Sequence, residues 1–330
     1  MKPLAITMGC PVGIGPELIL KLFASHGAGQ EMLVVGDPEV LVRTGRQLGL
    51  AAPVCSWQPG DDVEDGGIAV YNPCPEISLA GLSWGQPSKE SGRAMGCWIE
   101  AAVELCQQGE VSGLVTCPIT KTALNEGGYS FPGHTEMLAK LCHTKRFAMM
   151  MAGESLRVTL VTIHVALAQV PGLVTKESLA EMIGITWEAL RADFGLAEPR
   201  LAVAGLNPHG GEGGMFGREE EDIVAPAVAA ARVRGLDVAG PFPPDTVFHK
   251  AAAGQFDAVV CMYHDQGLIP FKLLHFSDGV NVTLGLPIVR TSVDHGTAYD
   301  IAGTGQADPA SLIAAVDLAA QIAANRRALP

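Results

Sequence analysis

Three histidines each follow an apolar run with the composition of a buried β-strand: His164, His209 and His264. Packing alone does not call for an imidazole there, and the carboxyl ends of strands are where open parallel sheets hold ligands. Three neutral imidazoles at such an edge would bind a divalent metal and leave coordination positions open. We therefore expect a catalytic metal site. The alternative, for each histidine alone, is a strand-end residue bonded to a backbone carbonyl.

A second group of polar residues is spaced nine positions apart, at Lys272, Asn281 and Arg290. Lysine and arginine among Val, Leu and Ile neighbours are costly to bury unless something negative pairs with them. A phosphate or carboxylate of a ligand would serve. The alternative is a surface lysine and an arginine paired within the fold.

Two glycine-rich stretches, residues 9–15 and 210–214, are candidate anion-binding turns. The first lacks the dinucleotide fingerprint because Leu18 occupies the place of its third glycine. The second does not continue into a phosphate-binding loop. Both patterns are equally typical of tight turns, so a nucleotide would need another element to hold it.

Strand-like runs alternate with segments of helical periodicity, which predicts an α/β fold whose mostly parallel sheet is flanked by helices. Strands are expected at residues 4–8, 32–36, 114–116, 147–151 and 157–163. Helices are expected at 16–26, 88–108, 176–193 with Thr175 as its cap, 219–234 and 310–326. A chain of 330 residues exceeds the length at which one core usually stops growing, so two domains are expected.

Composition narrows the class of protein. The formal net charge of −13, with no basic stripe to offset it, argues against nucleic acid as a partner. No apolar stretch has the length of a membrane span and the first residues lack a signal-peptide pattern, so we expect a cytoplasmic protein with no membrane partner. The eight cysteines form no Cys-x-x-Cys pair and are expected to be reduced.

A series of segments resembles the 4-hydroxythreonine-4-phosphate dehydrogenase family of vitamin B6 biosynthesis over nearly the full length of the chain. The segments are Val12-Gly-Ile-Gly-Pro-Glu17, Pro132-Gly-His-Thr-Glu136, Asn207-Pro-His-Gly-Gly-Glu212, Pro244-Asp-Thr246, Tyr263-His-Asp-Gln-Gly267, Val280-Asn-Val-Thr-Leu-Gly-Leu-Pro287 and Arg290-Thr-Ser-Val-Asp-His-Gly-Thr-Ala298. Because so many segments match in order, the resemblance is specific.

The resemblance implies a homodimer of protomers with two α/β/α domains, similar to isocitrate and isopropylmalate dehydrogenases. The active site would lie in the interdomain cleft and be shared between subunits. We expect a first domain of residues 1–130 plus 300–330, and a second domain of 131–299 with most of the metal and substrate ligands.

The resemblance also implies roles for particular residues. The three histidines named above would hold a divalent metal, with zinc favoured and magnesium, manganese or cobalt as alternatives. The small phosphorylated four-carbon substrate would be bound by His134, Thr135, Lys272, Asn281 and Arg290. Asp245 and Asp265 are implied as further polar residues of the same pocket.

The segment from His295 to Gly303 resembles the adenosine-binding loop of isopropylmalate and isocitrate dehydrogenases, which also lack the glycine fingerprint. Cofactor contacts are thereby implied for His295, Gly296, Ala298 and Asp300. In NADP-using members a Lys-Tyr pair aligns with Asp300 and Ile301. A carboxylate there would repel the 2′-phosphate, so we predict NAD.

The implied reaction oxidises 4-phosphooxy-L-threonine, also called 4-hydroxy-L-threonine phosphate, to a 3-oxo acid that loses carbon dioxide to give 3-amino-2-oxopropyl phosphate. The metal would lower the pKa of the alcohol, and hydride would pass to NAD. Candidates for the base that takes the hydroxyl proton are Asp245, Asp265 and Lys272, with an aspartate favoured.

The chain departs from the family pattern at Cys10, Val12 and Thr120, where an acidic residue, alanine and asparagine are usual. Cys10 is interpreted as a small packing residue rather than a nucleophile. One alternative is a sister dehydrogenase acting on 4-phospho-D-threonate or 4-phospho-D-erythronate. Others are a metal-dependent hydrolase and a catalytically silent nucleotide-binding protein, the last disfavoured because Lys272 and the three histidines are all present.

Overall fold

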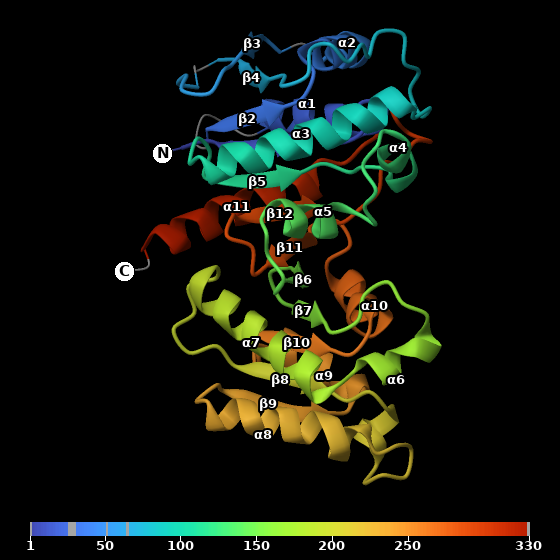
Figure 1. Cartoon of the computed structure of the whole chain (residues 1–330), viewed down its shortest axis with the longest axis vertical. Coiled ribbons are helices and arrows are strands. Elements are labelled where there is room, and N and C mark those ends of the chain that lie inside the picture. Colours follow the sequence, from blue (N-terminus) through green and yellow to red (C-terminus); the bar gives the residue numbers. More distant parts are fainter. Residues whose placement is uncertain (1, 26–30, 51, 64–65, 329–330) are drawn as a thin grey trace. The chain divides into compact units, whose positions relative to one another are not determined.

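The computed structural model describes residues 2–25, 31–50, 52–63 and 66–328. It divides the chain into two compact units (Figure 1). Unit 1 comprises residues 1–145 and 286–323, and unit 2 comprises residues 146–285 and 324–330. The domain boundaries predicted at 131 and 299 need correction because two elements inside them belong to unit 1. The helix α5 (His134–Leu141) packs on α3 (Lys89–Gln107), and the strand β12 (Arg290–Val293) pairs with β5 (Gly113–Thr116).

The sheet of unit 1 is parallel, with strand order β3-β4-β2-β1-β5-β12. Its remaining strands are β1 (Leu4–Thr7), β2 (Met32–Val35), β3 (Val54–Ser56) and β4 (Ile68–Tyr71). Every residue of β1, β2 and β5 is buried, as expected for apolar strands covered on both faces. The strands predicted at 4–8, 32–36 and 114–116 are confirmed to within a residue.

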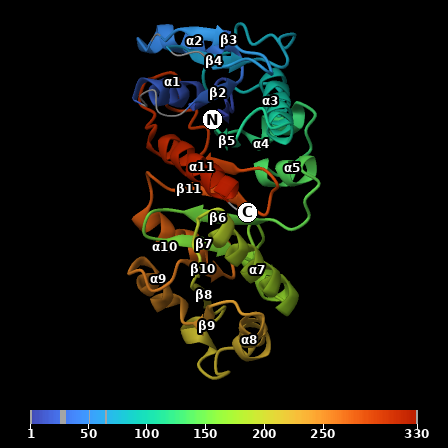
Figure 2. The ribbon, with the colours of Figure 1, turned by 90° about the vertical axis from the view of Figure 1, so that its left-hand side faces the viewer.

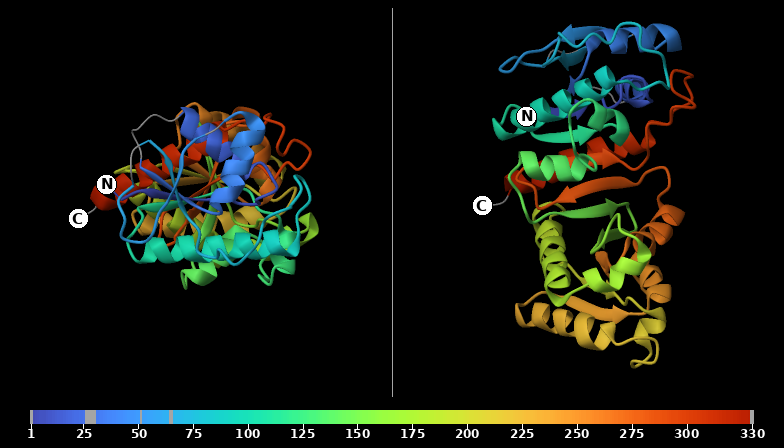
Figure 3. Two further views of the ribbon diagram at one scale, coloured as in Figure 1. Left: turned by 90° about the horizontal axis from the view of Figure 1, so that it is seen from above. Right: turned by 45° about the vertical axis from the view of Figure 1, so that its right-hand side comes forward.

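Helices cover both faces of this sheet. The remaining helices of unit 1 are α1 (Gly15–Ser25), α2 (Pro38–Leu48), α4 (Lys121–Glu126) and α11 (Ala310–Ala328), whose last turn is counted in unit 2. Figures 2 and 3 show α1 and α11 on one side of the strands and α3 on the other. The predicted helix 88–108 is α3, which begins with a capping box of Ser88 and Ser91. The predicted end of the first helix, His26, lies outside the described residues.

The sheet of unit 2 has strand order β11-β6-β7-β10-β8-β9. Its strands are β6 (Ala148–Ala152), β7 (Arg157–Leu160), β8 (Leu201–Ala204), β9 (Val238–Phe242), β10 (Ala258–Cys261) and β11 (Val280–Leu284). β6 is antiparallel to both of its neighbours, whereas β7, β10, β8 and β9 run parallel. The predicted mostly parallel α/β fold is therefore confirmed.

The helices of unit 2 are α6 (Val170–Leu173), α7 (Lys176–Ala192), α8 (Ala225–Val233), α9 (Pro244–Ala252) and α10 (His264–Leu274). Shorter segments are two 3-10 turns, η1 (Leu167–Gln169) and η2 (Pro208–Gly211), and a π-helical segment, η3 (Glu220–Val224). Figure 2 shows α9 and α10 on one face of the sheet and α7 and α8 on the other. The predicted Thr175 cap of α7 is confirmed. Within the described residues, no helix is both long and apolar enough to cross a bilayer.

Candidate active site

Neighbouring parallel strands of unit 2 deliver the candidate site residues to one edge of the sheet. β7, β10, β8 and β9 lie side by side in that order, so the loops that follow them emerge at the same edge. His164 follows β7, His264 follows β10, His209 follows β8 and Asp245 follows β9. The topology therefore brings all three histidines and one aspartate to the edge where a parallel sheet binds ligands.

The rings of His164 and His264 form a pair, with centroids 5.7 Å apart and planes inclined by 40°. They line a pocket of about 310 Å³ together with Thr162, Ile163, Val165, Leu167, Val170, Tyr263 and Asp265. His264 Nδ1 lies 2.7 Å from Asp265 Oδ1. A carboxylate on one ring nitrogen fixes the imidazole tautomer and leaves Nε2 as the nitrogen available to a metal.

His209 lies on the 3-10 turn η2 with left-handed backbone angles, φ 54° and ψ 22°. Its Nδ1 is 3.9 Å from Asp245 Oδ2, and both side chains are largely exposed. Across the described part of the chain, no group of three or more His, Cys, Asp or Glu side chains is arranged to hold a metal ion. The site therefore consists of two pairs, His164 with His264 and His209 with Asp245, rather than one gathered histidine triad.

Two further predicted substrate ligands lie on elements of unit 2. Lys272 is on α10, eight residues after His264, which corresponds to about 12 Å along the helix axis. Its Nζ is 6.0 Å from the centre of the Phe276 ring. Asn281 lies half-buried on β11, opposite Met151 of β6. The helix α10 thus carries a histidine at its first residue and a cation in its last turn.

The remaining predicted substrate ligands gather in unit 1. Arg290, the first residue of β12, is only 3% exposed, and its Nη2 donates to Thr116 Oγ1 at 2.8 Å. Burial lowers the pKa of Arg290 to about 9, an effect opposed by the charge of Glu136. The guanidinium is therefore still cationic at neutral pH. A buried cation of this kind suits an anionic ligand group.

His134 and Thr135 open helix α5 beside this arginine. Burial, reinforced by the nearby Arg290 charge, holds the pKa of His134 well below its usual value. The imidazole is therefore neutral at pH 7. Its Nε2 is buried and has no hydrogen-bond partner within the described residues. An unsatisfied buried nitrogen costs free energy that a ligand hydroxyl or phosphate oxygen would recover.

The candidate cofactor loop follows β12 in unit 1. His295, Gly296 and Asp300 are exposed, whereas Ala298 is half-buried and has a left-handed φ of 41°. An alanine in that conformation is strained, so the surrounding structure must hold it. The loop therefore presents an exposed polar surface on a constrained backbone.

The turn of residues 9–15 packs against this loop and hydrogen-bonds its backbone. A Cβ at Gly13 would lie 3.0 Å from Thr297 O, and Ile14 N donates to the same oxygen at 3.1 Å. Gly9 has φ +70°, and a Cβ there would lie 2.4 Å from Pro118 O. These glycines are needed for close backbone packing, which favours the tight-turn interpretation over an anion-binding loop.

Two of the departures from the family pattern meet at one tyrosine. Tyr299 Oη donates to Cys10 Sγ at 3.4 Å and also hydrogen-bonds the side chain of Thr120. Cys10 is fully buried, and burial raises the pKa of its thiol. A thiol kept protonated in this way is a poor nucleophile, which agrees with its interpretation as a packing residue.

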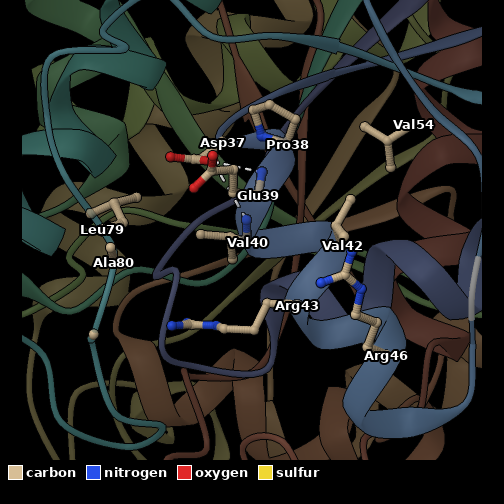
Figure 4. A pocket seen from close by; sticks show the side chains of 11 residues that line it. Asp37, Pro38, Glu39, Val40, Val42, Arg43, Arg46, Val54, Leu79 and Ala80 are labelled. Atoms are coloured by element: carbon tan, nitrogen blue, oxygen red, sulfur yellow. Dashed lines mark hydrogen bonds between the residues drawn. The ribbon is translucent and has the colours of Figure 1, made fainter.

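Another pocket, of about 600 Å³, runs along α2 and contains none of the predicted site residues (Figure 4). Asp37 Oδ1 accepts from Glu39 N at 2.7 Å and caps the helix. Arg43 stacks on Trp84 at 4.8 Å. Asp37 and Arg43, two of the charged residues labelled there, thus serve helix capping and packing.

Sequence reasoning missed a Ser-His-Asp arrangement in unit 2. Ser155 Oγ lies 2.8 Å from His275 Nε2, and His275 Nδ1 lies 3.1 Å from Asp278 Oδ2. The backbone N–H of Ser155 donates to the same Nε2 at 3.3 Å. Because the imidazole is bound by the backbone of the β6–β7 turn, it fastens that turn to the end of α10. No local sequence pattern marks this contact, since its members are far apart in the chain.

The fold defines a class of α/β proteins built from two compact units. A solved β-decarboxylating dehydrogenase from Thermococcus kodakarensis shares this fold at 14% identity and a TM-score of 0.50, covering 98% of this chain and 85% of its own. The family described as pyridoxal phosphate biosynthetic protein PdxA matches residues 28–319. The chain belongs to that family.

Individual relatives agree with this assignment. A 4-hydroxythreonine-4-phosphate dehydrogenase of Desulfosudis oleivorans is 55% identical over 332 aligned residues, which cover 98% of this chain and 97% of the relative. The crystal structure of a 4-hydroxythreonine-4-phosphate dehydrogenase from Klebsiella pneumoniae is 42% identical with a TM-score of 0.88, covering 98% of this chain and all of that one. The family resemblance predicted from the sequence motifs is confirmed.

Proposed function

We propose that this chain is a cytoplasmic, NAD-dependent 4-hydroxythreonine-4-phosphate dehydrogenase of pyridoxal phosphate biosynthesis. The observation that carries the proposal is 55% identity, over nearly the whole length of both chains, to a relative of that name. The substrate would be 4-phosphooxy-L-threonine. Its oxidation and decarboxylation would give 3-amino-2-oxopropyl phosphate.

Metal binding is proposed for His164, His209 and His264. Their imidazoles suit zinc, with magnesium, manganese or cobalt as alternatives. The fit of two of these ligands is supported by the His164–His264 ring pair and by the Asp265 carboxylate on His264 Nδ1, whereas His209 lies beside Asp245 and would have to join them. When bound, the cation would supply Lewis acidity toward the substrate hydroxyl and the product carbonyl.

The protein's own residues would bind and orient the substrate. Arg290, with the neutral His134 and Thr135 beside it, offers a buried cation for one anionic end. Lys272 and Asn281 are proposed as ligands of the rest of the molecule. Fixed placement of this kind lowers the barrier because reacting atoms are held together before the chemical step.

The proton of the substrate hydroxyl is proposed to pass to Asp245. Asp265 is already hydrogen-bonded to His264, so its carboxylate is used to orient that ring. Asp245 Oδ2 lies 3.9 Å from His209 Nδ1, beyond hydrogen-bond distance, and its side chain is largely exposed. It is therefore the aspartate better able to accept a proton from a ligand.

NAD is proposed to bind the loop that contains His295, Gly296, Ala298 and Asp300. The exposure of His295, Gly296 and Asp300 supports a binding role. The exposed carboxylate of Asp300 would accept hydrogen bonds from ribose hydroxyls and repel a 2′-phosphate. NAD is therefore favoured over NADP.

A homodimer is proposed on the outer face of α10 and the residues after it. Ile269, Leu273 and Phe276 are 61%, 81% and 81% exposed at helical spacing. Exposed apolar patches mark interaction sites, and symmetric dimers of one chain are the commonest soluble oligomers. The same helix carries His264 and Lys272, so the second copy would lie close to site residues.

The test is an NADH-absorbance assay with 4-phosphooxy-L-threonine, 4-phospho-D-threonate and 4-phospho-D-erythronate, with and without a chelator. We expect NADH formation with the first substrate, and loss of that activity when metal is stripped. Preference for either sugar acid would assign the sister activity. Metal-dependent phosphate release without NAD would identify a hydrolase, and retained turnover without metal would overturn the metal proposal.

A further inference from the structure

Glu17 is a buried carboxylate that neither the metal nor the substrate proposal uses. It lies in the first turn of α1 and is 1% exposed. Its Oε1 accepts from Ala307 N at 2.8 Å, and its Oε2 accepts from Gly305 N at 3.2 Å. A buried carboxylate is costly unless it is fully hydrogen-bonded, so these amides are part of its compensation.

Lys21, one helical turn later, completes the arrangement. Its Nζ lies 2.9 Å from Glu17 Oε1 and donates to Gly305 O at 2.8 Å and Ala307 O at 2.6 Å. Together the two side chains bind both the N–H and the C=O of residues 305 and 307. We call Glu17 and Lys21 the α1 clamp.

The clamped segment has no sheet or helix of its own to hold it. Residues 303–309 lie between the candidate cofactor loop and α11 in turn and irregular conformation, and Gly305 has φ +81°. The loop itself is bound at Thr297 O by Ile14 N, from the residue just before α1. The beginning of α1 therefore holds residues 297–307 near both ends.

We propose that Glu17 and Lys21 are positioning residues for the cofactor. They would fix the backbone of residues 303–307 and, through it, the loop 295–300 in the conformation that receives NAD. Neither side chain touches the cofactor in this scheme. A loop ordered in advance loses less conformational entropy on binding, so the α1 clamp contributes to NAD affinity rather than to the chemical step. The inference rests on the proposed function for its assignment of NAD to this loop.

The test uses the full-length Glu17→Gln and Lys21→Met variants and the neutral double variant Glu17→Gln/Lys21→Met. NAD affinity is measured by calorimetry without substrate, and hydrogen exchange is followed over residues 297–307. We expect the NAD Kd to rise about 10-fold or more, equivalent to about 1.4 kcal/mol, with faster exchange in this segment. The KM for the phosphorylated substrate and the kcat at saturating NAD should stay within roughly twofold, because the loop 295–300 is proposed to bind NAD and not the phosphorylated substrate.

Two controls separate positioning from a general loss of stability. Glu39→Gln makes the same chemical change at an exposed glutamate in the first turn of α2 and should leave the NAD Kd unchanged. Lys21→Arg keeps a charged donor and should restore most of the affinity lost in Lys21→Met. If Glu17→Gln does not fold, the double variant removes both charges together and leaves no uncompensated buried ion.

The outcomes are distinguishable. Unchanged hydrogen exchange over residues 297–307, an unchanged NAD Kd, or equal weakening of NAD binding and substrate binding in the variants would overturn the inference. The proposed function would still stand in that case, provided that the wild-type chain binds NAD. Failure of the wild-type chain itself to bind NAD would overturn the cofactor assignment and this inference with it.

Discussion

At the scale of single residues, Arg290 and His134 show how burial would prepare the proposed substrate site. Both side chains lose solvent, and each carries a pKa lowered by that loss. The arginine keeps its charge, whereas the histidine becomes a neutral donor or acceptor. A cation beside a neutral imidazole matches a phosphate, which requires positive charge and hydrogen-bond donors together.

The lowered pKa of His134 makes stability depend on pH. An unfolded chain binds a proton at this histidine below its ordinary pKa of 6.5, whereas the folded chain does not. This histidine therefore leaves the unfolding free energy unchanged above pH 6.5, and the unfolding free energy decreases as pH falls below that value because only the unfolded chain gains the proton. Between pH 6.5 and 5.5 the wild type should lose roughly 1 kcal/mol more unfolding free energy than His134→Gln, as measured by denaturant unfolding. Parallel pH profiles for the two proteins would contradict the neutral imidazole.

Asp300 and Ile301 are expected to set the choice of cofactor. The double substitution Asp300→Lys/Ile301→Tyr replaces a repelling carboxylate with a cation and a hydroxyl facing the 2′-phosphate. The ratio of kcat/KM for NADP to that for NAD should rise by about 10-fold or more, since one new charged hydrogen bond is worth roughly 1.5–3 kcal/mol. Asp62→Lys, at an exposed aspartate outside this segment, is the matched control. An unaltered cofactor ratio would remove residues 295–300 from the cofactor site.

At the scale of elements, the sequence predicted those whose signals are local. Apolar runs marked the buried strands β1, β2 and β5, and Thr175 marked the start of α7. The run 157–163 was predicted as one strand but ends at Leu160. Composition does not reveal this end, because the β-branched run continues through Val161 and Thr162. Their backbone N–H groups also still donate to the carbonyls of Cys261 and Met262 beside them.

Helix α10 shows why other elements were not predicted. Its N-cap, Tyr263, makes no side-chain capping bond, and Pro270 lies inside the helix. Both features disfavour a helix in sequence terms, and the apolar run before His264 predicts only the end of a strand there. Tertiary packing of α10 on β7 and β10 overrides them.

For the candidate site, too, the sequence predicts the features that follow from the strands and not those that depend on loop conformation. Alignment of apolar strands explains why three histidines reach one edge, since parallel neighbours place their loops together. The left-handed turn at His209 and the burial of His134 depend on loop conformation and on distant packing, which no spacing rule contains. The domain boundaries failed for a similar reason, because β12 joins β5 from the far end of the chain.

The last turn of α11 supplies a test at this scale. Arg326 Nε lies 2.6 Å from Asp193 Oδ1, and its Nη2 lies 3.1 Å from Oδ2, while Asp193 is 2% exposed. Arg326→Ala would leave a buried carboxylate without its cation, so we expect a loss of about 3 kcal/mol in unfolding free energy. The neighbouring Arg327→Ala, at an exposed position, should change stability by less than about 0.5 kcal/mol. Equal effects of the two substitutions would show that the ion pair contributes little.

At the scale of the whole molecule, a strongly acidic chain carries exposed apolar side chains on and just after α10. A net charge of −13 favours solubility and opposes association, so a dimer must bury enough apolar area to exceed that repulsion. The exposed Leu273 and Phe276 supply such area.

Leu273→Glu/Phe276→Glu should therefore convert a dimer to a monomer, as measured by sedimentation or light scattering. Activity should fall with it, since His264 and Lys272 share this helix. Val233→Glu places the same charge at a position 89% exposed at the end of α8 and should leave the dimer intact. A wild-type monomer, or a variant that stays dimeric, would locate association elsewhere.

The alignment of β7, β10, β8 and β9 has an evolutionary consequence. Each strand contributes its side chain through a separate connection, so one contributor can be exchanged while the backbone ladder beneath keeps its pairing. Substitutions at these positions can then change the chemistry of the site without changing the pairing of the strands. Descendants of this scaffold that take up a different chemistry should differ first at positions 164, 209, 245 and 264, while the interiors of the strands beneath them stay recognisable.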